Sequence, residues 1–351
     1  MQKLSLAVLA AVAILLVGAL GSPHRAGAAA NGAIAGHLTG PDGTPLAGTY
    51  VFAEAVVNNN HYTVTTDSNG NYSVPLPAGS YLLNFKPPCP TPYNLAPAWY
   101  PGVFSDLSAQ KVGVTAGQTT SVRTVAFVPS ATITGMLLDA QTGGPVSSAE
   151  MSVAALSGMN GGVGEGFLSG DTYTINCLPP GSYTVEFIPN AGTVNGIQQS
   201  PFYADEWYPN QPHQSQAQVI SLAPGQSVKL GVELAQAGGT VSGVVTSQHG
   251  RPLVGYWLGA GYTGPDGQFS VSFDDWPVTV SAAGTYSMPD MAPGTWTIAL
   301  FPHGGGVPPL QTRTVTVSAG QDTPNVNFTQ CVGAKCPTTL LGSPPRFARV
   351  C

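Results

Sequence analysis

Charged side chains are scarce in this sequence. Lysine and arginine number 11 and aspartate and glutamate 17 among 351 residues, which is 8 % of the chain, whereas soluble domains usually carry about a quarter. This composition excludes a charged helical protein. The net charge of −6, with no lysine- or arginine-rich run, also excludes nucleic acid as a partner, because phosphate binding needs a clustered basic surface.

The usual catalytic and metal-binding motifs are also missing. No histidine begins an H-x-x-E or H-E-x-x-H zinc pattern, and no G-x-S-x-G sequence is present. The acidic pairs Asp205-Glu206 and Asp274-Asp275 are neighbours that point to opposite faces of a strand, so we expect them on the surface rather than at a glycosidic bond. Asp67-x-Asn69-x-Asn71 has half the spacing of a calcium loop and is interpreted as a turn. We expect the isolated histidines to be solvated, and we predict neither an enzyme nor a cofactor or metal.

The first thirty residues have the pattern of a targeting segment. Lys3 precedes an apolar run from Leu4 to Leu20, and small residues follow at Ala26–Ala30. This pattern predicts a secretory signal peptide cleaved after Ala28 or Ala30, with an uncleaved anchor as the alternative. No second apolar run of spanning length follows. We therefore expect a secreted or cell-surface protein without a transmembrane segment after cleavage.

The sequence contains five cysteines, an odd number. All five, at Cys89, Cys177, Cys331, Cys336 and Cys351, follow the predicted signal peptide, so disulfides are permitted. Cys331 and Cys336 are the candidates for a small closed loop, which leaves Cys351 to pair elsewhere, another chain included. An odd count leaves at least one cysteine unpaired within the chain.

What the sequence has in abundance is turn residues and apolar side chains. There are 44 glycines and 32 prolines, and hydrophobic residues make up 43 % of the chain. Three copies of one pattern, about one hundred residues apart, account for most of it. Each copy opens with a strand that contains a glycine: Gly36, Gly135 or Gly243. Each then has a proline-glycine turn before an alternating strand: LPAGSYLLNF at 76–85, LPPGSYTVEF at 178–187 and MAPGTWTIAL at 291–300.

The alternation in these copies predicts which side chains form the core. Tyr81, Leu83 and Phe85 share one face of a strand, and the corresponding residues of the other copies do the same. We expect Gly79, Gly181 and Gly294 to adopt the unusual backbone angles of their turns. In the last strand of copy two, Val228, Leu230, Val232 and Leu234 alternate with Lys229, Gly231 and Glu233, which predicts one apolar and one solvated face.

Short alternating strands at about ten-residue spacing, without a long amphipathic helix, predict an all-β fold. We expect three consecutive Greek-key β-sandwich domains of about 100 residues each. The predicted organisation is a signal peptide at 1–30, repeat 1 at 31–129, repeat 2 at 130–237, repeat 3 at 238–330, and a cysteine-containing tail at 331–351. Links of a few residues predict that neighbouring domains lie end to end with limited freedom.

The glycine-bearing first strand, the turn PDGTPLAG at 41–48, TDSNGNYSV at 66–74 and LPAGSY at 76–81 together resemble the carboxypeptidase regulatory-like domain. The resemblance covers about residues 32–330 and implies a transthyretin-like or starch-binding-like sandwich of about seven strands, similar to repeats of bacterial surface adhesins. It does not imply one function. Copy three departs from the pattern, because it has the insert FSVSFDDWPV at 269–278 and lacks the segment described next.

Copies one and two share APAWYPGV at 96–103 and ADEWYPNQ at 204–211. Trp99, Tyr100, Trp207 and Tyr208 are candidate ligand-binding residues, because aromatic rings can stack on sugars; alternatively, they cover an open edge of each sandwich. We therefore favour a non-catalytic spacer or adhesion protein. The alternative is a polysaccharide-binding protein, and a third hypothesis is an accessory part of a secreted hydrolase. The expected partner is an extracellular polysaccharide or a component of the cell envelope.

Overall fold

The computed structural model describes residues 31–146, 151–157, 161–189, 193–194, 197–198, 203–263, 269–271, 278–302 and 309–331. The predicted signal peptide, Asp274-Asp275, Cys336 and Cys351 lie outside these ranges. The described chain is all-β, as predicted: its only helices are the short 3-10 helices η1 (Asp106–Ser108) and η2 (Gln214–Gln216). No helix in the described ranges has the length and apolar character needed to cross a membrane.

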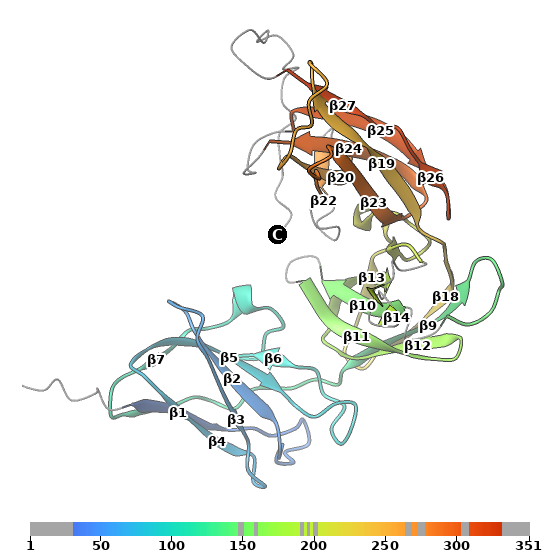
Figure 1. The fold of residues 1–351 in the computed structure, drawn as a ribbon. Helices are drawn as coiled ribbons and strands as arrows, with labels where there is room; N and C mark the ends of the chain where they lie inside the picture. Colours follow the sequence, from blue (N-terminus) through green and yellow to red (C-terminus); the bar gives the residue numbers. More distant parts are fainter. Residues whose placement is uncertain are drawn as a thin grey trace, which may run out of the picture.

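Repeat 1 folds into two sheets that face each other across a core (Figure 1). The smaller sheet has the order β4-β1-β8, with β1 (Gly32–His37), β4 (Asn71–Leu76) and β8 (Thr119–Ser121). The larger has the order β3-β2-β5-β6, with β7 also paired to β5; its strands are β2 (Tyr50–Ala55), β3 (His61–Thr65), β5 (Gly79–Lys86), β6 (Ala98–Trp99) and β7 (Val112–Val114). The chain crosses between the sheets from β1 to β2, from β3 to β4, from β4 to β5 and from β7 to β8.

Repeat 2 has the same strand succession, but its sheets are joined. Strand β11 pairs with both β10 and β12, so one eight-stranded sheet runs in the order β16-β13-β10-β11-β12-β9-β18, with β17 beside β13. The strands are β9 (Ala131–Asp139), β10 (Met151–Ser157), β11 (Gly161–Ser169), β12 (Thr172–Leu178), β13 (Gly181–Pro189), β16 (Glu206–Trp207), β17 (Ile220–Leu222) and β18 (Ser227–Ala235). Strands β14 (Thr193–Val194) and β15 (Ile197–Gln198) form a separate pair.

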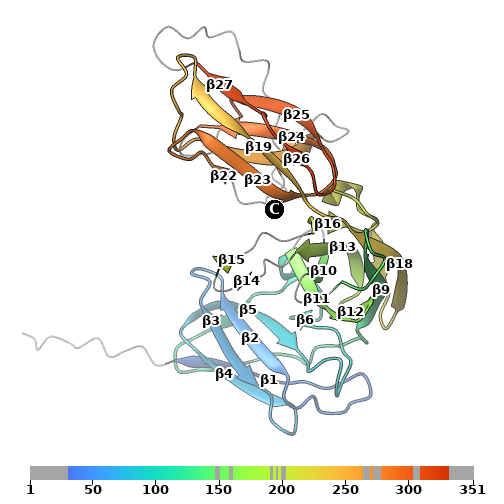
Figure 2. The same ribbon diagram turned by 45° about the vertical axis from the view of Figure 1, so that its right-hand side comes forward.

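Repeat 3 again forms two sheets. One contains β19 (Gly239–Ser247), β23 (Thr285–Met291), β26 (Asp322–Thr323) and β27 (Phe328–Gln330); the other contains β20 (Trp257–Thr263), β21 (Phe269–Val271), β22 (Val278–Thr279), β24 (Gly294–Phe301) and β25 (Gln311–Val317). In both views repeat 2 lies between repeats 1 and 3, and the chain follows an arc (Figure 1, Figure 2).

In repeats 1 and 2 the glycine of the first strand makes room for a tyrosine. Gly36 pairs with Tyr72 across β1 and β4, and a Cβ atom on Gly36 would lie 2.6 Å from the Tyr72 hydroxyl oxygen. Gly135 stands in the same relation to Tyr173. Gly243 also pairs with a tyrosine, Tyr286, but a Cβ atom on Gly243 would meet the Val326 carbonyl group instead. These tyrosines are buried in the three cores. The repeated glycine therefore reflects a close approach inside each sandwich.

The proline-glycine turns are fixed by the aromatic residue that follows them. The Tyr81 hydroxyl donates to the Pro77 carbonyl at 2.8 Å, and the Tyr183 hydroxyl donates to Pro179 at 2.6 Å. In repeat 3, Trp296 Nε1 donates to the Ala292 carbonyl at 2.8 Å. The predicted positive φ occurs only at Gly294; Gly79 and Gly181 begin strands in extended conformation, so this prediction was wrong for them. The aromatic hydrogen bond, rather than a left-handed glycine, holds the turn.

Strand β18 departs from the predicted alternation. Its pairing with β9 shifts register between Lys229 and Val232, which places a bulge in the strand. A bulge inserts one residue and inverts the alternation beyond it. Val232 and Leu234 are consequently 47 % and 42 % exposed, whereas Glu233 is fully buried. The prediction of Glu233 on the solvated face was wrong.

Candidate functional site

A cleft of about 1150 Å³ lies between repeats 1 and 2. One wall is the outer face of the larger sheet of repeat 1, and the other is the outer face of β10, β11 and β13 in repeat 2. Side chains from η1, the segment around Trp99 and the region of a disulfide complete the lining. The chain segments that form the cleft come from residues 52–106 and 153–188.

The wall in repeat 1 contains a row of three side chains on adjacent strands. Phe52 on β2 pairs with Asn84 on β5, and Asn84 pairs with Trp99 on β6. Directly opposed residues on neighbouring strands point to the same face, so the carboxamide lies between two aromatic rings. Asn84 is 7 % exposed, and its Oδ1 has no hydrogen-bond partner among the described residues.

Charged groups surround this row. Lys86 Nζ lies 5.2 Å from the centre of the Phe52 ring, within the range of a cation–π contact. Glu54 and His61 are cross-strand partners beside it. Asp106 of η1 and Glu165 of β11 also line the cleft. Three carboxylates therefore face one lysine and one histidine.

The wall in repeat 2 is mostly apolar. Ala154 and Leu156 from β10, Phe167 from β11 and Ile188 from β13 line it. Phe167 is 73 % exposed, although large aromatic side chains usually bury most of their surface. The cleft thus has aromatic rings on both walls.

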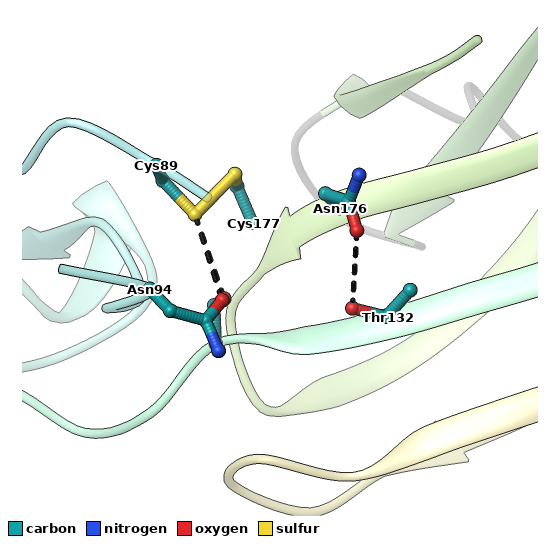
Figure 3. Close-up of a disulfide and its surroundings, with 6 residues drawn as sticks. Cys89, Asn94, Thr132, Asn176 and Cys177 are labelled. Carbon is teal, nitrogen blue, oxygen red and sulfur yellow. Dashed lines mark hydrogen bonds between the residues drawn. A yellow bond between two sulfur atoms is a disulfide. The ribbon is translucent and has the colours of Figure 1, made fainter. Parts of the chain in front are cut away.

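A disulfide joins Cys89 and Cys177, both of which line the cleft (Figure 3). Cys89 follows β5 in repeat 1, whereas Cys177 lies near the end of β12 in repeat 2, and their Cα atoms are 5.8 Å apart. Cys89 Sγ lies 4.0 Å from Asn94 Oδ1, which accepts a 2.7 Å hydrogen bond from Ser130 at the start of repeat 2. Repeats 1 and 2 are therefore joined by a disulfide as well as by the polypeptide chain.

Sequence reasoning did not pair these two cysteines. They occupy non-equivalent positions in their repeats, so the repeat pattern gives no reason to join them. The only sequence signal for this disulfide was the presence of both cysteines in a chain that is predicted to be exported. Cys331 is also disulfide-bonded, but its predicted partner, Cys336, lies outside the described residues, so that pairing stays a prediction.

The four predicted aromatic ligand-binding residues fall into two groups. Trp99 is partly exposed and lines the cleft. Tyr100 is buried in the core of repeat 1, and Tyr208 packs against the core of repeat 2, where its hydroxyl accepts a 3.0 Å hydrogen bond from the Gly231 N–H. Trp207 is 4 % exposed. Trp99 and Tyr208 are thus partly exposed, whereas Tyr100 and Trp207 are buried, and of the four Trp99 lines the cleft. A role in ligand binding stays a prediction for all four.

Two carboxyl groups are buried in repeat 2, against the expectation of a surface position for Glu206. Glu206 is 2 % exposed, and its Oε2 accepts from the Gln236 N–H at 3.3 Å; burial raises its pKa to about 7. Glu233 Oε1 accepts from the backbone N–H and the Nδ2 of Asn210, at 2.7 and 2.9 Å. Burial, reinforced by Glu206, raises the pKa of Glu233 to about 8. The register places Glu206 where repeat 1 has Ala98.

The junction between repeats 2 and 3 buries a histidine. His213, expected to be solvated, is buried instead, because its ring packs at 4.3 Å from that of Trp296 in repeat 3. Burial lowers its pKa. Ala204 of repeat 2 belongs to the hydrophobic cluster of repeat 3. The segment at 203–213 therefore joins the two repeats.

The remaining expectations about chemistry concern turns and metals. Asp67 Oδ1 accepts from the N–H groups of Asn69 and Asn71, at 2.9 and 2.8 Å, and Gly70 has a φ of 77°, which confirms the turn. Within the described ranges, no three His, Cys, Asp or Glu side chains are placed to hold a metal ion.

Comparison with known proteins identifies repeat 1. Residues 33–127 match the family model of the carboxypeptidase regulatory-like domain, which confirms the resemblance for this repeat. No curated protein gives a significant match.

Three solved structures illustrate the similarity to known folds. The Bacillus anthracis TIE protein is 13 % identical (TM-score 0.23; 86 % of this chain, 51 % of that chain). The minor pilin GBS52 of Streptococcus agalactiae is 12 % identical (TM-score 0.28; 59 % and 99 %), and the major pilin subunit BcpA of Bacillus cereus is 10 % identical (TM-score 0.23; 86 % and 99 %). The chain thus spans about half the length of the first structure.

Proposed function

We propose that this chain, whose repeat 1 matches the carboxypeptidase regulatory-like domain, is a non-catalytic protein of the cell surface or the extracellular medium. Its three sandwiches, at 31–129, 130–237 and 238–330, serve as a spacer or adhesion module that holds its parts at fixed positions. The observation that carries the proposal is the disulfide between Cys89 and Cys177, which ties repeat 1 to repeat 2.

The buried clusters support the division into three domains. Each cluster of buried hydrophobic residues draws almost all its members from one of the three ranges, and Ala204 is the exception. A separate core in each range is what independent domains require.

Both junctions support a restrained arrangement. At the first, the Ser130 N–H donates to the Asn94 carbonyl at 3.0 Å, next to the disulfide. At the second, His213 packs on Trp296 and the Gly320 N–H donates to Ala237 at 3.1 Å. Contacts beyond the linker reduce hinge motion between domains.

Small-angle X-ray scattering of the oxidised full chain tests this proposal. We expect one arrangement of the repeats to account for the scattering curve, and we expect Cys89→Ser to broaden the distribution of sizes. Cys331→Ser is the matched control, because it removes a disulfide outside repeats 1 and 2 and should leave the positions of the repeats unchanged. Equal flexibility in the wild type and in Cys89→Ser would contradict the spacer role of the disulfide.

Polysaccharide binding is the second candidate function, and the cleft beside Trp99 favours it. The third hypothesis, an accessory part of a secreted hydrolase, stays a prediction.

A further inference from the structure

We infer that the cleft between repeats 1 and 2 is a binding site for an extended, neutral polysaccharide. The inference rests on the proposed function, since the two walls face each other only while the repeats keep their arrangement.

The aromatic rings give the first argument. Phe52 and Trp99 flank Asn84 on the outer face of one sheet, and Phe167 stands exposed on the opposite wall. Phe52 and Trp99 lie two strands apart in the sheet, a distance of about 10 Å. Rings at this separation can each cover the apolar face of a different sugar in one chain. A short ligand such as a monosaccharide would use only part of this row.

The polar groups give the second argument. Glu54, Asp106, Glu165 and Asn176 offer hydrogen-bond acceptors around the cleft. Sugars combine apolar ring faces with many hydroxyl donors, which matches both features of the lining.

The charges of the lining decide the class of polysaccharide. Three carboxylates, from Glu54, Asp106 and Glu165, oppose Lys86 and His61. The Lys86 ammonium is already placed over the Phe52 ring. A polymer of uronic acids would bring further negative charge into this field and be repelled. A neutral polymer avoids this repulsion.

The construction of the walls disfavours a peptide. Both walls are faces of sheets, in which β2, β5, β10 and β13 each pair on both sides, so their backbone groups are bonded within the protein. Extended peptides gain much of their affinity from backbone hydrogen bonds to a free strand edge. This cleft offers side chains instead.

Affinity gel electrophoresis of the oxidised full chain tests the inference. The probes are soluble starch, laminarin and xyloglucan as neutral polysaccharides, polygalacturonate as an acidic one, and gelatin as a polypeptide. We expect at least one neutral polysaccharide to retard the protein and polygalacturonate to have no effect. Trp99→Ala and Phe52→Ala should each weaken the retardation by about tenfold, the effect of losing one aromatic contact. Val57→Ala is the control, because this residue of repeat 1 is 91 % exposed and does not line the cleft.

Several outcomes would overturn the inference. These are no retardation by any of the three neutral polymers, retardation that Trp99→Ala leaves intact, and retardation by polygalacturonate or gelatin alone. Scattering from the same samples separates this failure from failure of the spacer proposal. If the repeats keep one arrangement and no neutral polymer binds, only the site is refuted; if the arrangement is mobile, the spacer proposal fails.

Discussion

Replacing Glu233 by glutamine should stabilise repeat 2 increasingly as the pH rises from 5 to 9. Glutamine has nearly the shape of a protonated glutamic acid and keeps an oxygen to accept from Asn210, but it cannot ionise. The wild-type carboxyl group, fully buried beside Glu206, must either take up a proton on folding or carry a buried charge.

The sign and size of the effect follow from the pKa of this group. The pKa rises from 4.5 to about 8 on folding. Below pH 4.5 the carboxyl group is protonated in both the folded and the unfolded state, so it does not affect stability. Between pH 4.5 and 8 it is ionised only in the unfolded state, so the free energy of unfolding falls as the pH rises. Above pH 8 the loss of stability is constant. At 1.36 kcal/mol per unit, the loss is about 3 kcal/mol at pH 7 and about 5 kcal/mol at pH 9. Glu206 acts in the same direction, with a pKa raised from 4.5 to about 7.

Pulse proteolysis in urea measures the stability of repeat 2 separately, because mass spectrometry of the fragments shows which cleavages fall within residues 130–237. The wild type and Glu233→Gln are compared at pH 5, 7 and 9, so that the effect of pH on the protease cancels. Glu165→Gln is the control, since this glutamate of repeat 2 is exposed. A stability difference that is the same at all three pH values, or greatest at pH 5, would refute the reasoning.

Three further predictions concern packing and the junctions. Gly36→Ala should lower the free energy of unfolding of repeat 1 by about 1–3 kcal/mol, measured by urea unfolding, because the new methyl group meets the Tyr72 ring; an unchanged value would contradict the close approach. Cys89→Ser should lower stability by about 4 kcal/mol in non-reducing buffer, since the disulfide closes a loop with a sequence separation of 88, and Cys177→Ser should have the same effect. His213 has a lowered pKa, so its charging in the unfolded chain should destabilise the junction as the pH falls below about 6.5. Hydrogen exchange at 294–301 should then show less loss of protection between pH 7 and 5 in His213→Gln than in the wild type.

Much of the fold could be predicted because its signals are local. Tyr81, Leu83 and Phe85 alternate on one strand, and the structure buries all three. The glycine of each first strand was visible as a repeat, but its reason was not, because Gly36 and Tyr72 are far apart in the sequence and meet only through strand pairing. Glu233 was assigned to the wrong face because a bulge breaks the alternation on which that prediction depended.

The site was less accessible from the sequence. Trp99 could be chosen as a candidate from its residue type and from the Trp-Tyr-Pro segment that copies one and two share. The cleft could not, because its walls come from two repeats, and the Cys89–Cys177 disulfide that joins these repeats was not predicted. Phe52 and Asn84 lie on strands with ordinary alternation. The sequence shows that Phe52 points away from the core, but not that a second repeat lies opposite it.

The similarity of the Trp-Tyr-Pro segments has a structural origin that does not require a shared ligand. Tyr100 and Tyr208 each donate a backbone N–H at 2.9 Å to the adjacent long strand, at Leu83 and Val185 respectively. In repeat 3, β25 instead pairs with β24 continuously from Gly294 to Leu300. It fills the places that β6 and β7 share in repeat 1.

The segment is thus an insertion that divides an edge strand into two short pieces. In both repeats that have it, it meets the linker to the next repeat, through Leu95 and Pro129 in repeat 1 and through Tyr203 and Ala237 in repeat 2. Its recurrence therefore follows from joining consecutive repeats. Trp99 faces the cleft, whereas Trp207 is 4 % exposed, so these two residues, equivalent in sequence, should differ completely in their effect on ligand binding.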